Sequence, residues 1–357
     1  MWRVVMAQSE SKESDMVFPR EVLIGNGYIS KIGELCDRLK LGNRALIVCG
    51  EVTREIAGRN VAVSLSEKGY ACETVIEQRV THASTERVGE VAKDFDFIVA
   101  VGGGSRIDIA KMAAHIADIP FVSVPTTASH DGIASPRASI RENGSSISVE
   151  ASAPIAIIAD TGIVARAPYR LLASGCADLI SKRSSIKDWE LASRLKDEPF
   201  SSFAAALATL ACNTIIESAD VIKEGLEESA WIVLKSLVLS GVSMSIAGSS
   251  RPASGAEHLF AHALEATAPG RALHGEECGV GTIIMLYLHG EDWMGVRDVL
   301  KKIKAPTTAR DLGVRDEDVI DAMVMAHSMR MERYTILGEG ISRSAAEKAA
   351  RITGVIL

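Results

Sequence analysis

The sequence predicts two domains: an α/β domain with a Rossmann-like parallel sheet over residues 1–165, and an all-helical domain over residues 166–357. In the first part, short apolar runs alternate with helical stretches, a pattern typical of parallel strands joined by crossover helices. In the second part the strand-like runs disappear and long helical patterns replace them. A chain of 357 residues is also long enough for about two domains.

Six apolar runs in the first domain are expected to form strands. In chain order they are PREVLIG, RALIVCG, ACETVIE, FIVAV, PFVSVP and PIAIIAD. RALIVCG, which ends at Gly50, is continuously apolar and therefore suits a strand buried on both faces. The segments between these runs are expected to be helical, among them residues 53–68 and THASTERVGEVAKDFD.

The second domain consists of long helical patterns, and we find no internal repeat in the sequence. The main patterns are LLASGCADLISKRSSIKDWELASRL, SFAAALATLACNTIIESADVI, SAWIVLKSLVLSGVSMSIAG and VIDAMVMAHSMRM. The most apolar stretch, from Trp231 to Ala247, is interrupted by Lys235 and several serines. We therefore expect no membrane insertion.

Composition indicates an ordinary globular protein of the cytoplasm. Hydrophobic residues make up 47% and charged residues 24% of the chain, and the net charge of -7 leaves no basic surplus for a nucleic-acid partner. The six cysteines are scattered, without a Cys-x-x-Cys pair, which is typical of a reducing compartment. Residues 1–15 lack an apolar core long enough for a signal peptide.

A glycine-rich turn follows the strand FIVAV and precedes a helix that carries Asp108 and Lys111. The turn consists of Gly102, Gly103, Gly104 and Ser105. Glycines let the main chain approach a pyrophosphate closely, and the start of a helix presents free N–H groups. The context predicts a dinucleotide or another phosphorylated ligand, although a tight turn alone would also use such glycines.

The next strand is followed by PTTASHDGIASP, in which Thr126, Thr127 and Ser129 offer hydroxyl groups and Asp131 offers a carboxylate. Such a run of turn formers could be a solvent-exposed loop. It should, however, lie at the same sheet edge as the glycine turn, and open α/β sheets bind ligands at that edge. We therefore expect it to contribute to the same site.

Three histidines near residue 260 suggest a metal site. His258 and His262 are four residues apart in an apolar, alanine-rich run, so both rings should project from one helix face. The helix must end at Pro269-Gly270, and His274 begins the next segment. Spacing alone does not decide which helical histidine is a ligand, and histidines at such positions are also found as packed or surface residues.

A zinc-like ion needs further ligands, commonly including a carboxylate when the site is catalytic. Our candidate is Asp178, because a carboxylate in the apolar helical stretch around it would be costly unless it met a cation. Cys278, four residues after His274, is a possible further ligand, but a small buried thiol is the commoner role of such a residue.

Several segments together resemble the sn-glycerol-1-phosphate dehydrogenases of archaeal-type lipid synthesis. These segments are PREVLIGNG, VGGGSRIDIAK, PTTASHDGIASP, ASGCADLIS, DWELA, SGAEHLFAHAL, ALHGEECGVGT, ERYTIL and ITGVI. That family belongs to the superfamily of iron-containing alcohol dehydrogenases, glycerol dehydrogenases and dehydroquinate synthases. The resemblance implies a dehydroquinate synthase-like fold and a homo-oligomer.

The resemblance also implies roles for individual residues. Zn²⁺ would be held by Asp178, His258 and His274, while Asp131, Asp178 and His262 would contact the substrate, with Asp178 and His262 as the catalytic residues. NAD(P)H would lie along residues of the glycine turn and of the loop after the next strand. These are Gly103, Gly104, Ser105, Arg106, Ile107, Asp108, Thr126, Thr127, Ala128, Ser129 and Ser135.

The implied activity is the reversible, NAD(P)H- and zinc-dependent reduction of dihydroxyacetone phosphate to sn-glycerol 1-phosphate, the backbone of archaeal-type ether phospholipids. The alternative is a glycerol or polyol dehydrogenase with an unphosphorylated substrate. Dehydroquinate synthase chemistry is disfavoured by the SHDG segment, and a non-catalytic role is disfavoured by the complete Asp178, His258 and His274 set.

One departure from the family pattern is the pair Lys182-Arg183, where the family more often has an asparagine and an uncharged residue. Two cations near the metal ligand could meet a substrate phosphate, but we expect both side chains to point into solvent, because most charged residues on helices are exposed. The residues that bind the substrate phosphate stay undetermined.

Overall fold

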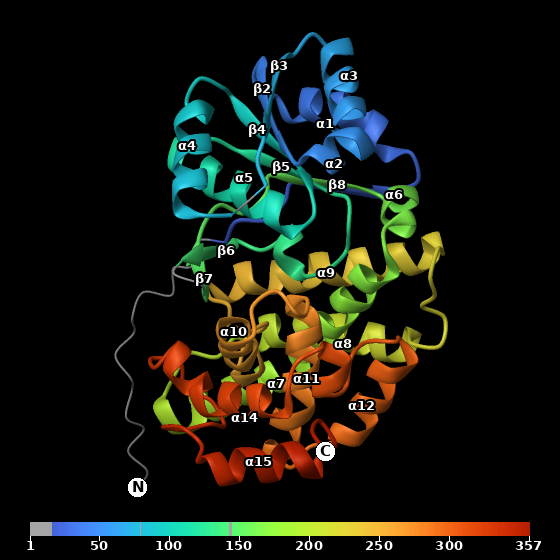
Figure 1. Cartoon of the computed structure of the whole chain (residues 1–357). Coiled ribbons are helices and arrows are strands. Elements are labelled where there is room, and N and C mark those ends of the chain that lie inside the picture. Colours follow the sequence, from blue (N-terminus) through green and yellow to red (C-terminus); the bar gives the residue numbers. More distant parts are fainter. Residues whose placement is uncertain (1–15, 79, 143–144) are drawn as a thin grey trace, which may run out of the picture.

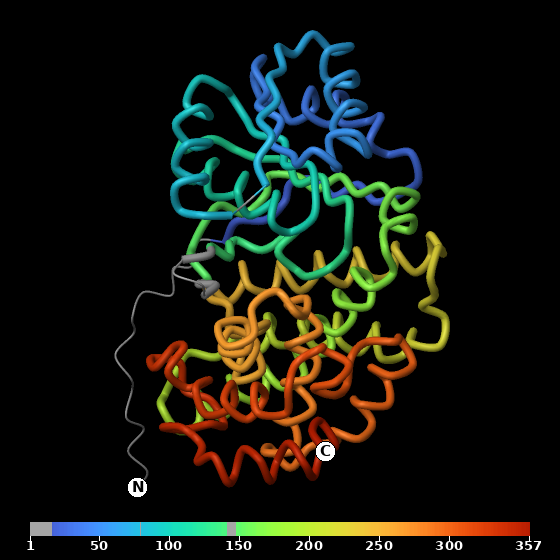
Figure 2. Tube along the Cα trace, viewed as in Figure 1, coloured from blue at the N-terminus to red at the C-terminus, as the bar shows by residue number. Residues whose placement is uncertain are grey.

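The computed structural model describes residues 16–78, 80–142 and 145–357. An α/β half, formed by the N-terminal part of the described chain, is stacked on a helical half formed by the C-terminal part (Figures 1 and 2). Residues 1–15, where the sequence lacks a signal-peptide pattern, lie outside the described residues.

The α/β half is built on a six-stranded parallel sheet with the order β1-β8-β5-β4-β2-β3. Its strands are β1 (Glu21–Gly25), β2 (Arg44–Cys49), β3 (Ala71–Ile76), β4 (Phe97–Gly102), β5 (Phe121–Pro125) and β8 (Ala156–Asp160). Every residue of β4, β5 and β8 is buried, which explains their continuous apolar runs. All six expected strands are present.

Helices cover both faces of this sheet. They are α1 (Ile32–Leu39), α2 (Glu51–Thr53), α3 (Arg59–Glu67), α4 (His82–Ala92) and α5 (Gly104–Ala117), with the 3₁₀ turn η1 (Tyr28–Lys31) and the π-helical segment η2 (Arg54–Gly58). The stretch 53–68 is therefore helical, as expected, but changes its hydrogen-bond pattern at η2. One sheet face packs with α1 and α3 into a separate core. The other shares a continuous apolar cluster with the helical half.

A small hairpin was not foreseen from the sequence. It consists of β6 (Arg137–Glu142) and β7 (Ser145–Glu150), which pair antiparallel after the 3₁₀ turn η3 (Asp131–Ile133). The segment RASIRENGSSISVE does carry a hairpin signal, since Asn-Gly separates two alternating runs. Its serines and charged residues interrupt the apolar pattern that is typical of a buried strand.

The helical half contains α6 (Thr161–Arg166), α7 (Tyr169–Lys196), α8 (Ser202–Ser218), α9 (Glu227–Ala247), α10 (Ala256–Thr267), α11 (His274–His289), α12 (Trp293–Lys302), α13 (Ala309–Leu312), α14 (Asp316–Met325), η4 (Ala326–Met329) and α15 (Arg343–Ile352). All described strands precede α6, within which the expected boundary at residue 165 falls. Helix α9 is long and apolar enough to span a membrane, but 56% of its apolar window is buried against the rest of the protein.

Candidate active site

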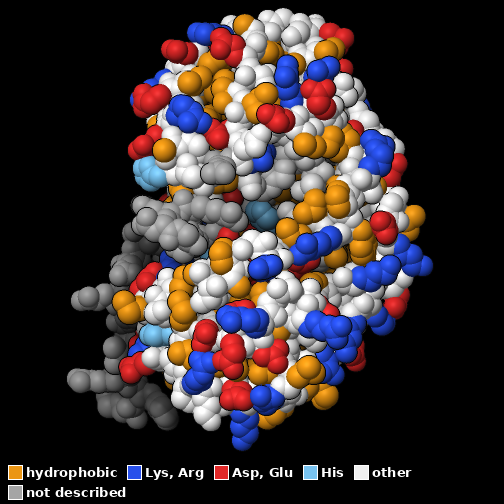
Figure 3. All heavy atoms as spheres, in the orientation of Figure 1, with side chains coloured by type: hydrophobic (Ala, Val, Ile, Leu, Met, Phe, Trp, Pro, Cys, Tyr) orange, Lys and Arg blue, Asp and Glu red, His pale blue; other side chains and the backbone are white. Residues whose placement is uncertain are grey.

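The candidate site is a cleft of about 440 Å³ lined by residues of both halves. One end lies beside Thr53 and Val80, which follow β2 and β3, and the other end lies beside His258 and His274. The space-filling view shows a furrow between the two halves with a histidine side chain visible inside it (Figure 3). The cleft therefore connects the edge of the parallel sheet with the first turns of α10 and α11.

The glycine turn forms the middle of this cleft. Gly103 is the N-cap of α5, and Gly104 begins the helix. A Cβ on Gly104 would collide with the imidazole of His130, so only glycine fits against that ring. The free N–H groups at the start of α5 border the cleft, which is the arrangement that suits a pyrophosphate.

Most of the cofactor residues expected from the sequence border the cleft. These are Gly103, Gly104, Ser105, Arg106, Asp108, Thr127, Ser129 and Ser135. Ile107, Thr126 and Ala128 are buried and do not line it. Asp108 forms an ion pair with the buried Lys111 (3.5 Å), whose ammonium group also donates to the carbonyl oxygens of Gly132 and Arg137, so this pair ties α5 to the loop after β5.

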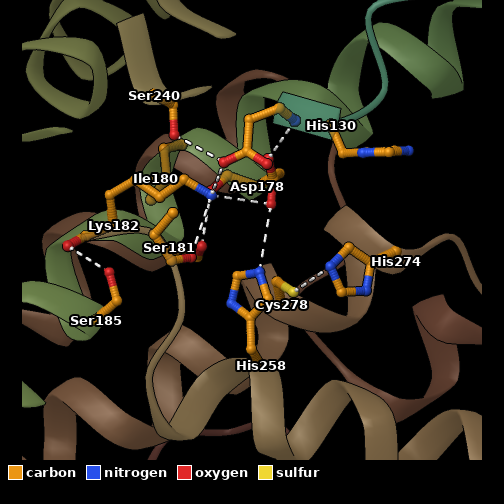
Figure 4. A network of polar contacts seen from close by, with 12 residues as sticks. His130, Asp178, Ile180, Ser181, Lys182, Ser185, Ser240, His258, His274 and Cys278 are labelled. Atoms are coloured by element: carbon orange, nitrogen blue, oxygen red, sulfur yellow. Dashed lines mark hydrogen bonds and ion pairs between the residues drawn. The ribbon is translucent and has the colours of Figure 1, made fainter. Parts of the chain in front are cut away.

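The expected metal ligands come together at the helical end of the cleft. Asp178 of α7, His258 of α10 and His274 of α11 each offer a ligand atom, and with Cys278 these atoms lie within 4.8 Å of one another. The nitrogen Nε2 of His258 is 3.7 Å from Oδ1 of Asp178, and the rings of His258 and His274 are 5.0 Å apart (Figure 4). Two imidazoles and a carboxylate are a donor set that suits a catalytic zinc ion.

His262 does not belong to that group, although it is one helical turn from His258. Its ring centroid is 5.7 Å from that of His274, and its buried Nδ1 atom has no hydrogen-bond partner in the structure. Cys278, the less favoured candidate, does belong: its Sγ atom is 3.6 Å from Nε2 of His274. The assignment of the individual ligands stays a prediction.

The pKa values of His262 and His274 lie below the ordinary histidine value. Burial, reinforced by the charge of His258 and of Arg333, lowers the pKa of His262 to about 4. Burial likewise lowers the pKa of His274 well below its ordinary value, with His258 and His262 adding to the effect. A neutral imidazole keeps a lone pair for a metal ion or a proton.

Glu257 orients His258, a role that the sequence analysis missed. Its carboxylate is fully buried and lies 2.8 Å from Nδ1 of His258, and it also accepts hydrogen bonds from Ser184 and the backbone of Gly255. Burial raises the pKa of Glu257, but the hydrogen bond and charge of His258, together with the hydrogen bonds from Gly255 and Ser184, hold the pKa below its ordinary value. With Nδ1–H donated to Glu257, Nε2 faces the ligand group.

The expectation that Lys182 points into solvent is wrong. Its side chain is fully buried, and its ammonium nitrogen lies 3.0 Å from Oδ2 of Asp131 and 3.1 Å from Oδ1 of Asp178 (Figure 4). The physical reason is that these two carboxylates, one helical turn away and on the facing loop, need a cation. Arg183, the next residue, is only partly buried.

Asp131 and Asp178 are joined to each other as well as to Lys182. The backbone N–H of Asp131 donates to Oδ2 of Asp178 (3.0 Å), and Ser240 of α9 donates to Oδ2 of Asp131 (2.7 Å). Burial raises the pKa of Asp131, but the Lys182 ammonium, the hydrogen bond from Ser240 and the charge of His258 together hold the pKa below its ordinary value. Burial lowers the pKa of Lys182, but the combined attraction of the Asp131 and Asp178 carboxylates is stronger. The pKa of Lys182 is therefore raised above its ordinary value.

Known proteins resemble this chain in sequence and in fold. A family model described as iron-containing alcohol dehydrogenase matches residues 23–168. Two solved structures share the fold: glycerol dehydrogenase from Schizosaccharomyces pombe (TM-score 0.81, 22% identity, 96% of this chain and 91% of that one) and an iron-containing alcohol dehydrogenase from Thermotoga maritima (TM-score 0.71, 20% identity, 96% and 99%). By fold the protein is thus of the dehydroquinate synthase-like, iron-containing alcohol dehydrogenase class, as the sequence predicted.

Closer relatives define the family within that class. The chain is 54% identical over 343 residues to glycerol-1-phosphate dehydrogenase (NAD(P)+) from Methanosarcina mazei, covering 96% of both chains. It is also 54% identical over 339 residues to the enzyme of that name from Methanothermobacter thermautotrophicus, covering 95% of this chain and 98% of the other. The chain belongs to the glycerol-1-phosphate dehydrogenase family, which confirms the resemblance seen in its motifs.

Proposed function

We propose that the protein catalyses the reversible reduction of dihydroxyacetone phosphate to sn-glycerol 1-phosphate with NAD(P)H and zinc. The product would supply the backbone of archaeal-type ether phospholipids. The observation that carries this proposal is the convergence of Asp178, His258 and His274 beside Asp131, in a cleft whose other part is a glycine turn at a helix start. The relatives at 54% identity carry this product in their names.

When bound, zinc would stabilise the negative charge that develops on the ketone oxygen, and the nicotinamide would supply the hydride. Asp178, His258 and His274 would hold the metal ion. Asp131, kept ionised by Lys182, can accept hydrogen bonds from substrate hydroxyl groups. The N–H groups of the glycine turn would orient the cofactor, so that the two reactants meet between the halves.

His262 is proposed to relay the proton that the new alkoxide requires. Its ring lies in the cleft beside His274 and is neutral at pH 7, so one nitrogen can accept a proton while the other gives one up. Because Nδ1 has no partner within the protein, a substrate hydroxyl group or a water molecule can serve as its partner.

A glycerol or polyol dehydrogenase is the alternative, and the names of the close relatives do not favour it. The decisive assay compares dihydroxyacetone phosphate with dihydroxyacetone, using NADPH and NADH, before and after chelation, with the chirality of the product determined. Fast, chelator-sensitive reduction of the phosphorylated ketone to sn-glycerol 1-phosphate is expected. Equal rates on both ketones, or the opposite enantiomer, would refute the proposal.

The remaining expectations also belong to this proposal. We infer a cytoplasmic homo-oligomer whose partners are the substrate and the cofactor, without nucleic acid and without membrane insertion. The burial of much of α9 supports its role as a core helix.

A further inference from the structure

Arg106 occupies a slot formed by two glycines at the edge of the sheet. It is the third residue of α5, and its side chain folds back toward the end of β2. A Cβ on Gly102 would lie 2.6 Å from its Cγ atom, and a Cβ on Gly50 would lie 2.8 Å from its Nε atom. Gly50 directly follows β2, so the guanidinium group takes the space that a side chain at this position would fill.

Among the described residues, the guanidinium group of Arg106 forms one hydrogen bond. Its Nη1 atom donates to the carbonyl oxygen of Gln78, whereas its buried Nε atom has no hydrogen-bond partner. Burial lowers the pKa of Arg106, and the charge of Cys49 acts in the opposite direction. A half-buried arginine that forms no ion pair with a carboxylate among the described residues is suited to an anionic ligand.

The position of Arg106 in the cleft indicates which part of a dinucleotide it would meet. The loop after β5 lies on one side of β4, and its Asp131 contacts Asp178 of the ligand group, beside which the nicotinamide must react. The cleft continues on the other side of β4, over β2 and β3, to Thr53 and Val80. That end remains for the adenosine half of the cofactor, and Arg106 borders it.

In dinucleotide-binding sheets, an acidic residue near the end of the second strand binds the ribose 2′-hydroxyl of NAD, whereas a nearby arginine accommodates the 2′-phosphate of NADP. Here the residue after β2 is Gly50, and the acidic residue that follows it, Glu51, is exposed in the first turn of α2. Arg54, whose positive charge acts on Cys49 together with that of Arg106, adds to the positive potential at this corner.

We propose that Arg106 binds the adenosine 2′-phosphate of NADPH and makes the protein select NADPH over NADH. This inference rests on the proposed function, because it requires a nicotinamide cofactor in the cleft. It goes further in assigning a phosphate subsite to one residue of this chain and in choosing between the two cofactors.

The test is a binding measurement that does not depend on turnover. Dissociation constants are determined by titration for NADPH, NADH, 2′,5′-ADP and 5′-ADP with the wild type, Arg106→Met and Arg106→Lys. The wild type should bind the two 2′-phosphorylated ligands more tightly than their counterparts. Arg106→Met should weaken binding of those two ligands about tenfold to a hundredfold, the range for loss of a charge-assisted contact, and leave NADH and 5′-ADP unchanged.

Arg59→Met is the matched control, since Arg59 lies on the neighbouring helix α3, is exposed, and pairs with Glu55 across one helical turn. It removes the same charge and should alter none of the four affinities. Arg106→Lys, which keeps the charge, should retain part of the preference for NADPH and guards against misfolding of the methionine variant.

An unchanged NADPH preference in Arg106→Met, or an equal loss for NADH and NADPH, would overturn the inference and leave the proposed function intact. If the wild type bound neither cofactor, the proposed function itself would fail, and this inference with it. A wild type that binds 5′-ADP as tightly as 2′,5′-ADP would likewise overturn it.

Discussion

The Lys182 ammonium group neutralises two carboxylates, Asp131 and Asp178, in the middle of a long buried helix. This single side chain provides a cation for both carboxylates. It also places a positive charge next to Asp178, which is expected to bind the metal ion. Lys182 therefore stabilises the metal-free site and should weaken metal binding.

Replacement of Lys182 by methionine tests this double role. We expect Lys182→Met to lower the free energy of unfolding of the chelated protein by about 3–5 kcal/mol, because two buried carboxylates lose their cation. Zinc should bind more tightly, since the repulsion is gone. Urea unfolding with and without chelator, combined with a zinc competition titration, measures both effects. Arg183→Met, on the same helix but only partly buried, is the control, and an unchanged stability of chelated Lys182→Met would contradict this account.

The neutral state of His262 has a consequence for stability against pH. Its pKa is about 4 in the folded protein, below the ordinary value of 6.5, so between these values the unfolded chain binds the extra proton. The free energy of unfolding should therefore fall as the pH is lowered from about 6.5 to 4, by up to about 3 kcal/mol for this residue.

That slope should be reduced in His262→Gln, which cannot take up the proton. The comparison uses chelated protein at fixed ionic strength and measures unfolding by urea at several pH values. A variant and a wild type with parallel pH profiles would show that His262 is not held neutral by its surroundings.

At the scale of elements, the sequence predicted those parts that follow from local patterns. The strands β4, β5 and β8 are continuous apolar runs because they are buried on both faces. The end of α10 before Pro269 and the start of α11 at His274 could be predicted from the local sequence. The metal ligands could be grouped, but the choice of His258 over His262 depended on the family resemblance.

Other features depend on long-range packing and could not be read from local patterns. Helix α7 is buried around most of its circumference, so its sequence carries no apolar stripe from which the environment of Lys182 could be inferred. The contact of Glu257 with Ser184 joins two helices far apart in the chain. The β6–β7 hairpin was missed for a different reason, since its Asn-Gly signal lies among polar residues.

Asp188 of α7 joins this helix to α10, to α11 and to the turn that contains Ile336, and it provides a test at this scale. Its carboxylate contacts Nε2 of His289 (3.0 Å) and accepts hydrogen bonds from the backbone of Ala256 and Ile336. We expect Asp188→Ala to cost about 3–5 kcal/mol of unfolding free energy, because these buried groups lose their partner. Thermal or urea unfolding measures it.

Asp220→Ala is the control for that experiment. Asp220 forms an exposed ion pair with Lys302, and its loss should cost no more than about 1 kcal/mol. Equal costs for the two substitutions would mean that the buried carboxylate does not hold α10 and α11 against α7.

At the scale of the whole molecule, the two halves supply different parts of one site. The sheet edge offers the glycine turn and Asp131, and the helical half offers the ligand group and His262. One apolar cluster runs from Leu46 and Ile98 of the sheet to Leu264 of α10, so the halves are packed through a shared core. This shared core brings residues that are distant in the chain within hydrogen-bonding distance, such as Asp131 and Asp178.

The most direct test of the central claim compares His274→Ala with His262→Ala for zinc content and for reduction of dihydroxyacetone phosphate. His274→Ala should lose zinc and activity together, because a ligand is removed. His262→Ala should keep the zinc content of the wild type and turn over slowly. Tight zinc in His274→Ala, or loss of zinc from His262→Ala alone, would contradict the assignment of the site.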